Sequence, residues 1–252
     1  MTGQARKLQS KLKHPVVVFD RNGRIRSNEM WFHNPRILTN WDRKSPVHPL
    51  NNGPGVRPYI HAKTERQWVW KDFECTPGEL YFSAAELAAA DRAPKDFVVV
   101  EPNNKAKASP NKDWGWERWQ ALVYLLKAEG HRVAQMGAYG MKMLTGVAPI
   151  YTGTFREACA VLAKAKAAVL PEGGLHHAAA AVGVSSVVIY GGYISPKQTG
   201  YLLHRNLFTG GEPCGWRIPC KHCEKAMAAI TPEQVVRDLS EVVNARQIIP
   251  RV

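Results

Sequence analysis

Residues 169–193, "VLPEGGLHHAAAAVGVSSVVIYGGY", place an alanine-rich stretch between two apolar runs. The first run, extended backwards to "AAVLP", is typical of a short buried strand, and "SSVVIYGG" is typical of another. Between them "LHHAAAAVG" favours a helix that can pack closely on a sheet. A strand, a helix and a strand in this order indicate parallel strands covered on both faces, as in α/β proteins.

The same alternation continues on both sides of this stretch. "DFVVVEP" (96–102) and "HRVAQMG" (131–137) are typical of buried strands, while residues 115–130, 154–165 and 231–247 have helical spacing. Residues 1–95 are less regular: after a strand at 15–20 they are rich in Pro, Asn, Trp and Arg, with a small helix at 83–92. We therefore predict a reduced, irregular domain at 1–95 and a doubly wound domain at 96–252.

Composition places the chain among folded globular proteins. Its 252 residues are 45% hydrophobic, which suffices for a core, and no run approaches the roughly 20 apolar residues of a membrane span. The first residues are basic but lack the apolar core of a secretory signal, so we expect a cytoplasmic protein. An odd number of cysteines, five, favours reduced thiols or a metal over a disulfide framework.

Positive charge is concentrated near the start of the chain. The net charge of +13 reflects 34 Lys and Arg against 21 Asp and Glu, and residues 1–26 hold seven of the cations with Asp20 as their single acid. Such a field attracts polyanions, namely nucleic acid, anionic lipid headgroups or phosphorylated glycans. The alternative is a solvated basic tail.

Ligands of doubly wound sheets bind beyond the carboxyl ends of the strands. This rule selects four loops, at 101–116, 136–140, 171–177 and 190–198, of which three contain paired or near-paired glycines. The first carries Lys105, Lys107 and Lys112. Bare amides at a helix start beside lysines predict a phosphate or diphosphate site. Neither G-x-G-x-x-G nor G-x-x-x-x-G-K-[ST] is present, which argues against a dinucleotide fold and a P-loop kinase.

The third loop concentrates candidate site residues. Glu172 is either a ligand group or an acid favoured by the helix dipole, and Gly173 with Gly174 either forms a tight turn or admits a ligand to the backbone. His176 and His177 point in different directions on a helix, so we expect one to face the cleft and the other to pack.

Several motifs now resemble those of glycosyltransferase family 9, the ADP-heptose:lipopolysaccharide heptosyltransferases, over roughly residues 97–240. Lys112 and Trp114 match a Lys-x-Trp motif. "EGGLHHAAAA" matches D-[ST]-G-x-x-H-x-A-x-A through Gly174, His177, Ala179 and Ala181, with Glu172 in place of Asp and Gly173 in place of Ser or Thr. "VVIYGGY" (187–193) is similar to V-x-L-F-G-P-T, and "CEKAMAAITPEQV" (223–235) to C-M-x-x-I-T-P-E-x-V, with Ala226 in place of the usual cysteine.

The resemblance implies a GT-B fold of two Rossmann-like domains, here with a shortened first domain that lacks the family's Gly-Asp motif. It implies inverting sugar transfer from a nucleotide sugar without a catalytic metal. Lys112 and the amides of Gly191 and Gly192 would stabilise the leaving diphosphate, Glu172 would bind sugar hydroxyls, and His177 would position the donor. The base would be Glu29 or Asp20, with Glu29 preferred, although either acid can equally be a surface carboxylate.

The acceptor side is the reduced domain, and its basic, Trp-rich composition fits an anionic acceptor. A lipopolysaccharide core and the hydroxylated bases of phage-type DNA both qualify, since aromatic side chains among cations suit sugar rings and unstacked bases alike. Two other classes stay open: an inactive nucleic-acid-binding protein on a glycosyltransferase fold, and a structural or assembly subunit. These motifs do not distinguish donor bases, sugars or oligomeric states.

A cysteine-rich loop follows the last predicted strand. Cys214, Cys220 and Cys223 are spaced by six and three positions, and His222 stands beside the C-x-x-C pair. Such a pair is a common half of a zinc or iron site, with His222, His204 or Cys75 as the fourth ligand. Some autotransporter heptosyltransferases resembling this family carry an iron-binding cysteine cluster here. The alternative is three reduced thiols packed under a loop.

Overall fold

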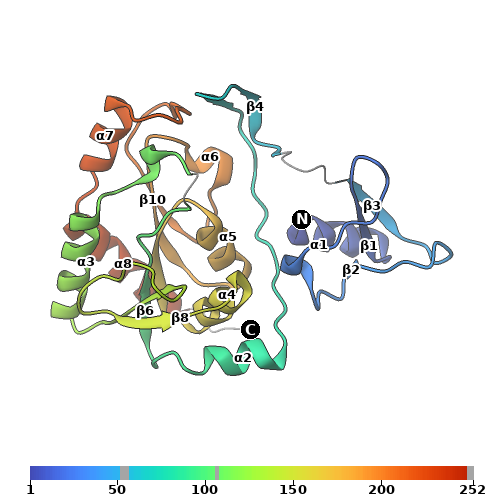
Figure 1. Ribbon diagram of the computed structural model, residues 1–252, viewed down its shortest axis with the longest axis horizontal. Helices are drawn as coiled ribbons and strands as arrows, with labels where there is room; N and C mark the ends of the chain where they lie inside the picture. The colour runs from blue at the N-terminus through green and yellow to red at the C-terminus, as the bar shows by residue number, and fades with distance from the viewer. Residues whose placement is uncertain (52–56, 106–107, 249–252) are drawn as a thin grey trace.

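The computed structural model describes residues 1–51, 57–105 and 108–248, which form a large lobe and a small lobe joined by an extended segment (Figure 1). A six-stranded sheet forms the centre of the large lobe. Its strands are β6 (Phe97–Val100), β7 (Arg132–Gly137), β8 (Ala148–Tyr151), β9 (Ala167–Pro171), β10 (Ser186–Gly191) and β11 (Arg205–Phe208). Its helices are α3 (Trp116–Ala128), α4 (Phe155–Lys164), α5 (Gly174–Ala181), α6 (Pro196–Thr199), α7 (Lys221–Ala228) and α8 (Pro232–Ile248).

The strand order of the large sheet is β11-β10-β9-β6-β7-β8, and every pair is parallel. Counted from β6, this is the doubly wound order 3-2-1-4-5-6 read from the other edge. The chain reverses direction of winding between β6 and β9, which pair through Val98 and Ala167. The predicted doubly wound sheet is therefore confirmed, and its ligand crevice is expected beyond β6 and β9.

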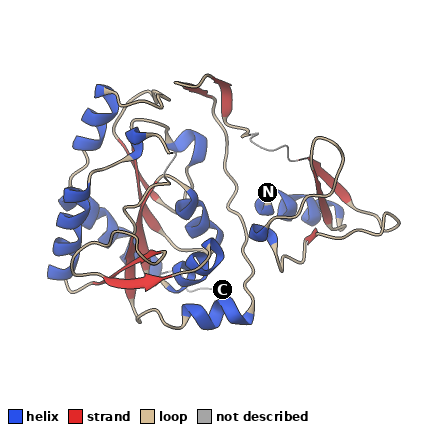
Figure 2. Ribbon diagram, viewed as in Figure 1, coloured by secondary structure: helices blue, strands red, loops and turns tan. Residues whose placement is uncertain are grey.

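Alternation along the central strand explains why helices cover both faces of the sheet. In β6, Val98 and Val100 belong to the core beside α3 and α8, whereas Phe97 and Val99 belong to the core beside α4 and α5. All four side chains are fully buried. A strand that is apolar on both faces can only be satisfied by helices on each side, as Figure 2 shows.

The small lobe contains helix α1 (Thr2–Leu12), the short 3-10 helix η1 (Glu29–Trp31), and the strands β1 (Val16–Phe19), β2 (Ile37–Leu38) and β3 (His48–Asn51). These strands form a parallel sheet in the order β2-β1-β3. Its core consists of Ala5, Val16, Val18, Trp31 and Ile37. The small lobe is thus a short parallel α/β unit with three strands among the described residues.

A hairpin and a helix from the first 95 residues pack on the large lobe instead of the small one. The hairpin strands β4 (Ile60–Lys63) and β5 (Trp68–Trp70) are antiparallel, and the Trp70 indole donates a hydrogen bond to the Tyr193 carbonyl at 2.9 Å. Helix α2 (Ala84–Ala90) packs on α4. Between β5 and α2, residues 71–83 run as an extended segment along the boundary of the two lobes (Figure 1). The division at residues 95 and 96 stays a prediction.

Polar contacts of Arg156 and Glu79 help to attach the small lobe to the rest of the molecule. The buried Arg156 of α4 donates to the Glu29 carbonyl at 2.8 Å and forms an ion pair with Glu86 of α2 at 2.5 Å. Glu79 of the extended segment pairs with Arg6 and Arg36 of the small lobe at 3.0 and 3.1 Å. Among the described residues, no helix combines the length and apolarity that crossing a membrane demands.

Candidate active site between the two lobes

A buried ion pair lies at the carboxyl edge of the sheet, where β6 and β9 diverge. Glu172 follows β9 and pairs with Lys112, which ends the 3-10 helix η2 (Pro110–Lys112). The two side chains are 6% and 18% exposed. Burial opposes the charge on Glu172, but the Lys112 ammonium outweighs it and lowers the carboxyl pKa to about 2. The two sequence-predicted residues therefore meet, and Glu172 is ionised at neutral pH.

The backbone after Glu172 opens toward the same edge. At Gly173 a Cβ would meet nothing closer than 4.0 Å, so the bare chain is accessible to a ligand. Its amide donates to His176 Nδ1 at 2.8 Å, and His176 Nε2 donates to the Thr199 carbonyl at 2.9 Å. Because both ring nitrogens are used, His176 packs, as expected of one of the two histidines.

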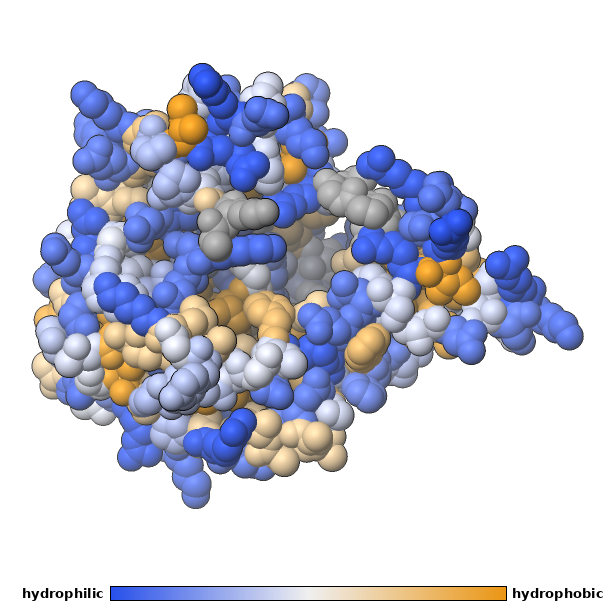
Figure 3. Space-filling model, viewed as in Figure 1, coloured by the Kyte–Doolittle hydropathy of each residue, from blue (hydrophilic) through white to orange (hydrophobic). Residues whose placement is uncertain are grey.

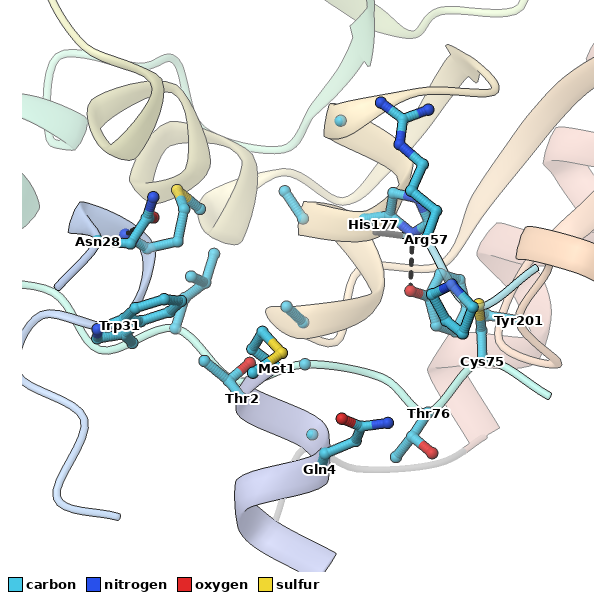
Figure 4. A pocket seen from close by; sticks show the side chains of 18 of the residues that line it. Met1, Thr2, Gln4, Asn28, Trp31, Arg57, Cys75, Thr76, His177 and Tyr201 are labelled. Atoms are coloured by element: carbon cyan, nitrogen blue, oxygen red, sulfur yellow. Dashed lines mark hydrogen bonds between the residues drawn. The ribbon is translucent and has the colours of Figure 1, made fainter. Parts of the chain in front are cut away.

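His177 is the histidine that faces the space between the lobes. Its Nδ1 lies 2.7 Å from the hydroxyl of Tyr201, which is the contact drawn in Figure 4. Burial, together with the neighbouring His176, lowers the pKa of His177 to about 3. The ring is consequently neutral at physiological pH and acts through hydrogen bonds, not through charge.

Glu172, His176 and His177 offer three ligand atoms within 4.8 Å of one another. They do not fit a metal ion, because Lys112 already neutralises the carboxylate and both nitrogens of His176 are hydrogen-bonded within the protein. The chemistry of this group is that of a hydrogen-bonding cradle beside an ammonium.

Three of the predicted donor-binding residues are packed inside the large lobe. Trp114 is fully buried, donates from its indole to the Ile230 carbonyl at 2.9 Å and touches Trp119 edge-on. A Cβ on Gly191 would lie 2.5 Å from Met227, and one on Gly192 would lie 2.8 Å from His222, so these glycines admit α7. The packing of Trp114, Gly191 and Gly192 therefore gives no support to a direct contact between these residues and a ligand. Of the other loop lysines, Lys105 is exposed and Lys107 lies outside the described residues.

A cavity of about 650 Å³ lies between α5 and the small lobe, and Lys112, Glu172 and Gly173 are not among the residues that line it. Gly174 and His177 line it from the large lobe, and Asn28 and Trp31 line it from the small lobe (Figure 4). Arg57 reaches into it from beside the hairpin (Figure 4). Within the described part of the chain, the cavity thus brings both lobes and the third predicted loop to one space.

Neither predicted base residue is among the residues that line this cavity, although Asn28 and Met30, on either side of Glu29, are. Asp20 accepts hydrogen bonds from the amides of Asn22 and Arg24, at 2.8 and 2.9 Å, and these bonds lower its carboxyl pKa. Glu29 is exposed at the start of η1, and its carbonyl holds Arg156. A catalytic role for either stays a prediction.

Sequence reasoning missed Tyr201, Arg57 and Glu74, which all line the cavity. None of them lies in a periodic segment or a recognisable motif. Tyr201 sits in the loop before β11, while Arg57 and Glu74 belong to the irregular stretch between the lobes. The one signal that could have found them is the clustering of Arg, Trp and acids in residues 57–74, which pattern analysis assigned to an irregular domain.

The cysteine-rich loop brings four donor atoms together. Sγ of Cys214 lies 3.1 Å from Sγ of Cys223 and 3.8 Å from Sγ of Cys220, and His222 Nδ1 lies 3.7 Å from Cys223 Sγ. All four atoms lie within 4.8 Å of one another, and His222 Nε2 is turned to the Gly210 carbonyl at 2.6 Å. Three thiols and one imidazole with its second nitrogen hydrogen-bonded are a fitting tetrahedral set for zinc or iron.

The other candidates for the fourth ligand are engaged elsewhere. His204 Nε2 donates to the His176 carbonyl at 3.0 Å, and the Cys75 thiol donates to the Gln198 carbonyl at 3.4 Å. Among the three histidine and cysteine candidates, the structure therefore brings only His222 to the three clustered thiols.

The cysteine loop is also tied to the donor edge. Asn111, next to Lys112, donates to the Trp216 and Ile218 carbonyls at 2.8 Å and accepts from the Cys220 amide at 3.1 Å. The Cys214 amide donates to the Gly192 carbonyl at 3.0 Å. The cysteine loop is consequently hydrogen-bonded to the residue next to Lys112.

Comparison with known proteins finds a matching family model and similar solved structures. The family model described as "Glycosyltransferase family 9 (heptosyltransferase)" matches residues 69–229, and no curated protein sequence matches the chain. Similar solved structures include E. coli ADP-heptose lipopolysaccharide heptosyltransferase II, with 20% identity and a TM-score of 0.51 over 71% of this chain and 55% of that chain. A family 9 glycosyltransferase from Veillonella parvula DSM 2008 has 16% identity and a TM-score of 0.52, covering 68% and 55%.

A further similar structure contains a bound nucleotide sugar. Dodecameric iron-containing heptosyltransferase TibC, a protein of enterotoxigenic E. coli, in complex with ADP-D-β-D-heptose, has 16% identity and a TM-score of 0.56, covering 84% of this chain and 64% of that chain. At these identities the likeness establishes the fold. The chain spans 55–64% of the length of these three proteins.

Proposed function

The chain belongs to glycosyltransferase family 9, whose model covers more than half of it, and from this premise we propose that it transfers a sugar from a nucleotide sugar to a hydroxyl of an anionic acceptor. The reaction inverts the anomeric centre and uses no catalytic metal. One observation carries the proposal: Lys112, Glu172 and the bare backbone of Gly173 converge beyond β6 and β9. That position is where a doubly wound sheet binds its ligand.

Each of these groups has a role that its surroundings favour. The Lys112 ammonium and the amides at the start of α5 stabilise the negative charge that develops on the departing nucleoside diphosphate. Glu172, held ionised, accepts hydrogen bonds from sugar hydroxyls. Neutral His177, fixed by Tyr201, orients the donor by a hydrogen bond. The backbone at Gly191 and Gly192 and the buried Trp114 support the edge from behind.

The acceptor is proposed to be anionic because of the charge on the small lobe. Residues 1–51 contain ten Lys and Arg against three Asp and Glu, and the visible face of this lobe is mostly hydrophilic (Figure 3). Lys7, Arg26 and Arg57 line the cavity opposite the donor edge. A lipopolysaccharide core or hydroxylated bases of phage-type DNA would each match this field.

Donor binding is the first test of the proposal. Lys112→Ala should weaken the affinity for ADP and for ADP-D-β-D-heptose by about 1–3 kcal/mol, because it removes a charged partner of the phosphates. Calorimetric titration measures the effect, with Lys127→Ala at the far end of α3 as the matched control. Equal affinities of the Lys112→Ala variant and the native protein would exclude the diphosphate from this edge.

A second candidate function is nucleic-acid binding without catalysis, favoured by the ten cations of residues 1–51. Binding that falls steeply with salt while no donor is consumed would support it. Release of ADP from a nucleotide sugar together with labelling of either acceptor supports the transferase instead.

We also propose that Cys214, Cys220, Cys223 and His222 hold a structural zinc or iron ion. The ion would fix the loop that supports Lys112 through Asn111. Elemental analysis of protein purified without a histidine tag should give about one equivalent of metal, and Cys220→Ser should lower it. Less than about a tenth of an equivalent in folded native protein would leave these thiols as packing.

A further inference from the structure

The cavity between the lobes contains a carboxylate that neither predicted base residue provides. Among the described residues that line it, Glu74 is the single acidic side chain, while Asp20 and Glu29 lie outside the lining. Glu74 is exposed and belongs to the extended segment that separates the lobes. Its position therefore differs from those of Asp20 and Glu29, which belong to the small lobe.

The segment around Glu74 is held against the donor edge on both sides of that residue. The Phe73 amide donates to the Lys197 carbonyl at 3.0 Å, and the Cys75 thiol donates to the Gln198 carbonyl at 3.4 Å. Cys75 also lies against Tyr201, the residue whose hydroxyl contacts His177 (Figure 4). Glu74 thus precedes Cys75, which contacts Tyr201, the hydrogen-bond partner of His177.

Cations line the same cavity as Glu74. Lys7 and Arg57 line the same space, and the Arg57 guanidinium lies over the Trp68 ring at 5.1 Å, which holds it beside the cavity. The same cations offer a counter-charge to an anionic group on the acceptor.

From these contacts we propose that Glu74 is the catalytic base of the sugar transfer, an inference that rests on the proposed function. The Glu74 carboxylate takes the proton of the acceptor hydroxyl. The acceptor oxygen forms a bond to the anomeric carbon, the bond from that carbon to the diphosphate oxygen breaks, and the electron pair leaves on the nucleoside diphosphate beside Lys112. The proton passes from Glu74 to water.

The test compares four isosteric variants for release of ADP from ADP-D-β-D-heptose. Core lipopolysaccharide and duplex DNA containing hydroxymethylcytosine serve as the two acceptors. Glu74→Gln should lower kcat by about 10²- to 10⁴-fold, which is the contribution of a general base. Its affinity for ADP and its Tm should match the native protein. Asp72→Asn is the control, because Asp72 lies two residues away and accepts a hydrogen bond from Gln198 at 3.0 Å instead of lining this cavity.

A Glu74→Gln variant that keeps the native kcat would overturn the assignment while leaving the transferase proposal intact. If Glu29→Gln or Asp20→Asn then lowers kcat by about 10²- to 10⁴-fold, that residue is the base. If the native protein binds ADP but releases none from the sugar donor with either acceptor, the transferase proposal fails and the role of Glu74 fails with it.

Discussion

Glu101 is a carboxyl buried at the carboxyl end of β6, beside the proposed donor site. Burial raises its pKa to about 7, although the amide and side chain of Asn103 donate hydrogen bonds to it at 3.0 and 2.8 Å. The folded state therefore prefers protonated Glu101, and its contribution to stability is full below the ordinary pKa near 4.5 and is lost as pH rises through 7.

Glu101→Gln should remove this loss, because the amide keeps an acceptor for Asn103 and carries no charge. At pH 8 the variant should be more stable than the native protein by on the order of 2–3 kcal/mol, and at pH 4 the two should agree. Urea unfolding at both pH values measures the difference. The exposed Glu117→Gln serves as control. A Glu101→Gln variant that is no more stable than the native protein at pH 8 would contradict the buried titration.

The Lys112–Glu172 pair behaves in the opposite sense. Its carboxyl pKa of about 2 means that the pair stabilises the fold above the ordinary value near 4.5, and that this stability is lost as pH falls toward 2. Glu172→Gln should cost about 3 kcal/mol at pH 7, because Lys112 is left largely buried without its partner. The variant should also lack the acid-induced loss between pH 4.5 and 2, which urea unfolding across that range will reveal.

At the level of single residues, motifs located Lys112, Glu172 and His177 because family-like spacing and the strand ends select them. The motifs did not predict that Trp114 is buried. By sequence, a tryptophan at a helix start is equally compatible with stacking on a ligand and with packing in the core. Packing against Trp119 decides the case, and such a contact has no one-dimensional signal.

Among the elements, long apolar runs and helical periods were predictable, whereas short edge elements were not. β8 contains Pro149 and lies at the sheet edge, where a proline is tolerated, and β11 at the other edge has four residues without clear alternation. α7 starts directly after Cys220 and contains Cys223. The spacing of these cysteines therefore indicated a metal-binding loop and not a helix. Tertiary contacts define all three.

The glycines at the end of β10 carry an element-scale prediction. Gly192→Ala would place a methyl group 2.8 Å from His222 and 3.0 Å from Ala226, both on α7, so the helix must shift. We expect a loss of about 1–3 kcal/mol in unfolding free energy and a lower metal content. Gly153→Ala, whose new Cβ would meet only Glu157 at 3.5 Å, is the control. Unchanged stability would show that α7 is not packed on this turn.

At the scale of the whole molecule, the Arg156 side chain of α4 joins three parts of the chain through polar contacts. It bonds Glu86 of α2, the Tyr81 carbonyl of the extended segment and the Glu29 carbonyl of the small lobe. Arg156→Met should therefore cost about 3–5 kcal/mol, the scale of breaking a buried pair. It should also loosen the small lobe, and limited proteolysis between the lobes should quicken.

Lys164→Met on the same helix is the control for Arg156, because its ion pair with Asp91 is solvent-exposed and such pairs contribute about 0–1 kcal/mol. Equal urea midpoints for the two variants would contradict a joining role for Arg156. The sequence could not have predicted this junction, since Glu29, Tyr81 and Glu86 show no spacing that relates them to Arg156.

The hairpin of β4 and β5 has a consequence for synthesis on the ribosome. Gln67 donates to the Cys214 carbonyl across a separation of 147 residues, and the Trp68 amide bonds the Gly215 carbonyl. At about 5–20 residues per second, the nascent hairpin waits roughly 7–30 seconds for these partners. During that time the two tryptophans of β5 lack the partners that residues 193 and 215 provide. A segment made early thus reaches its native contacts among the last.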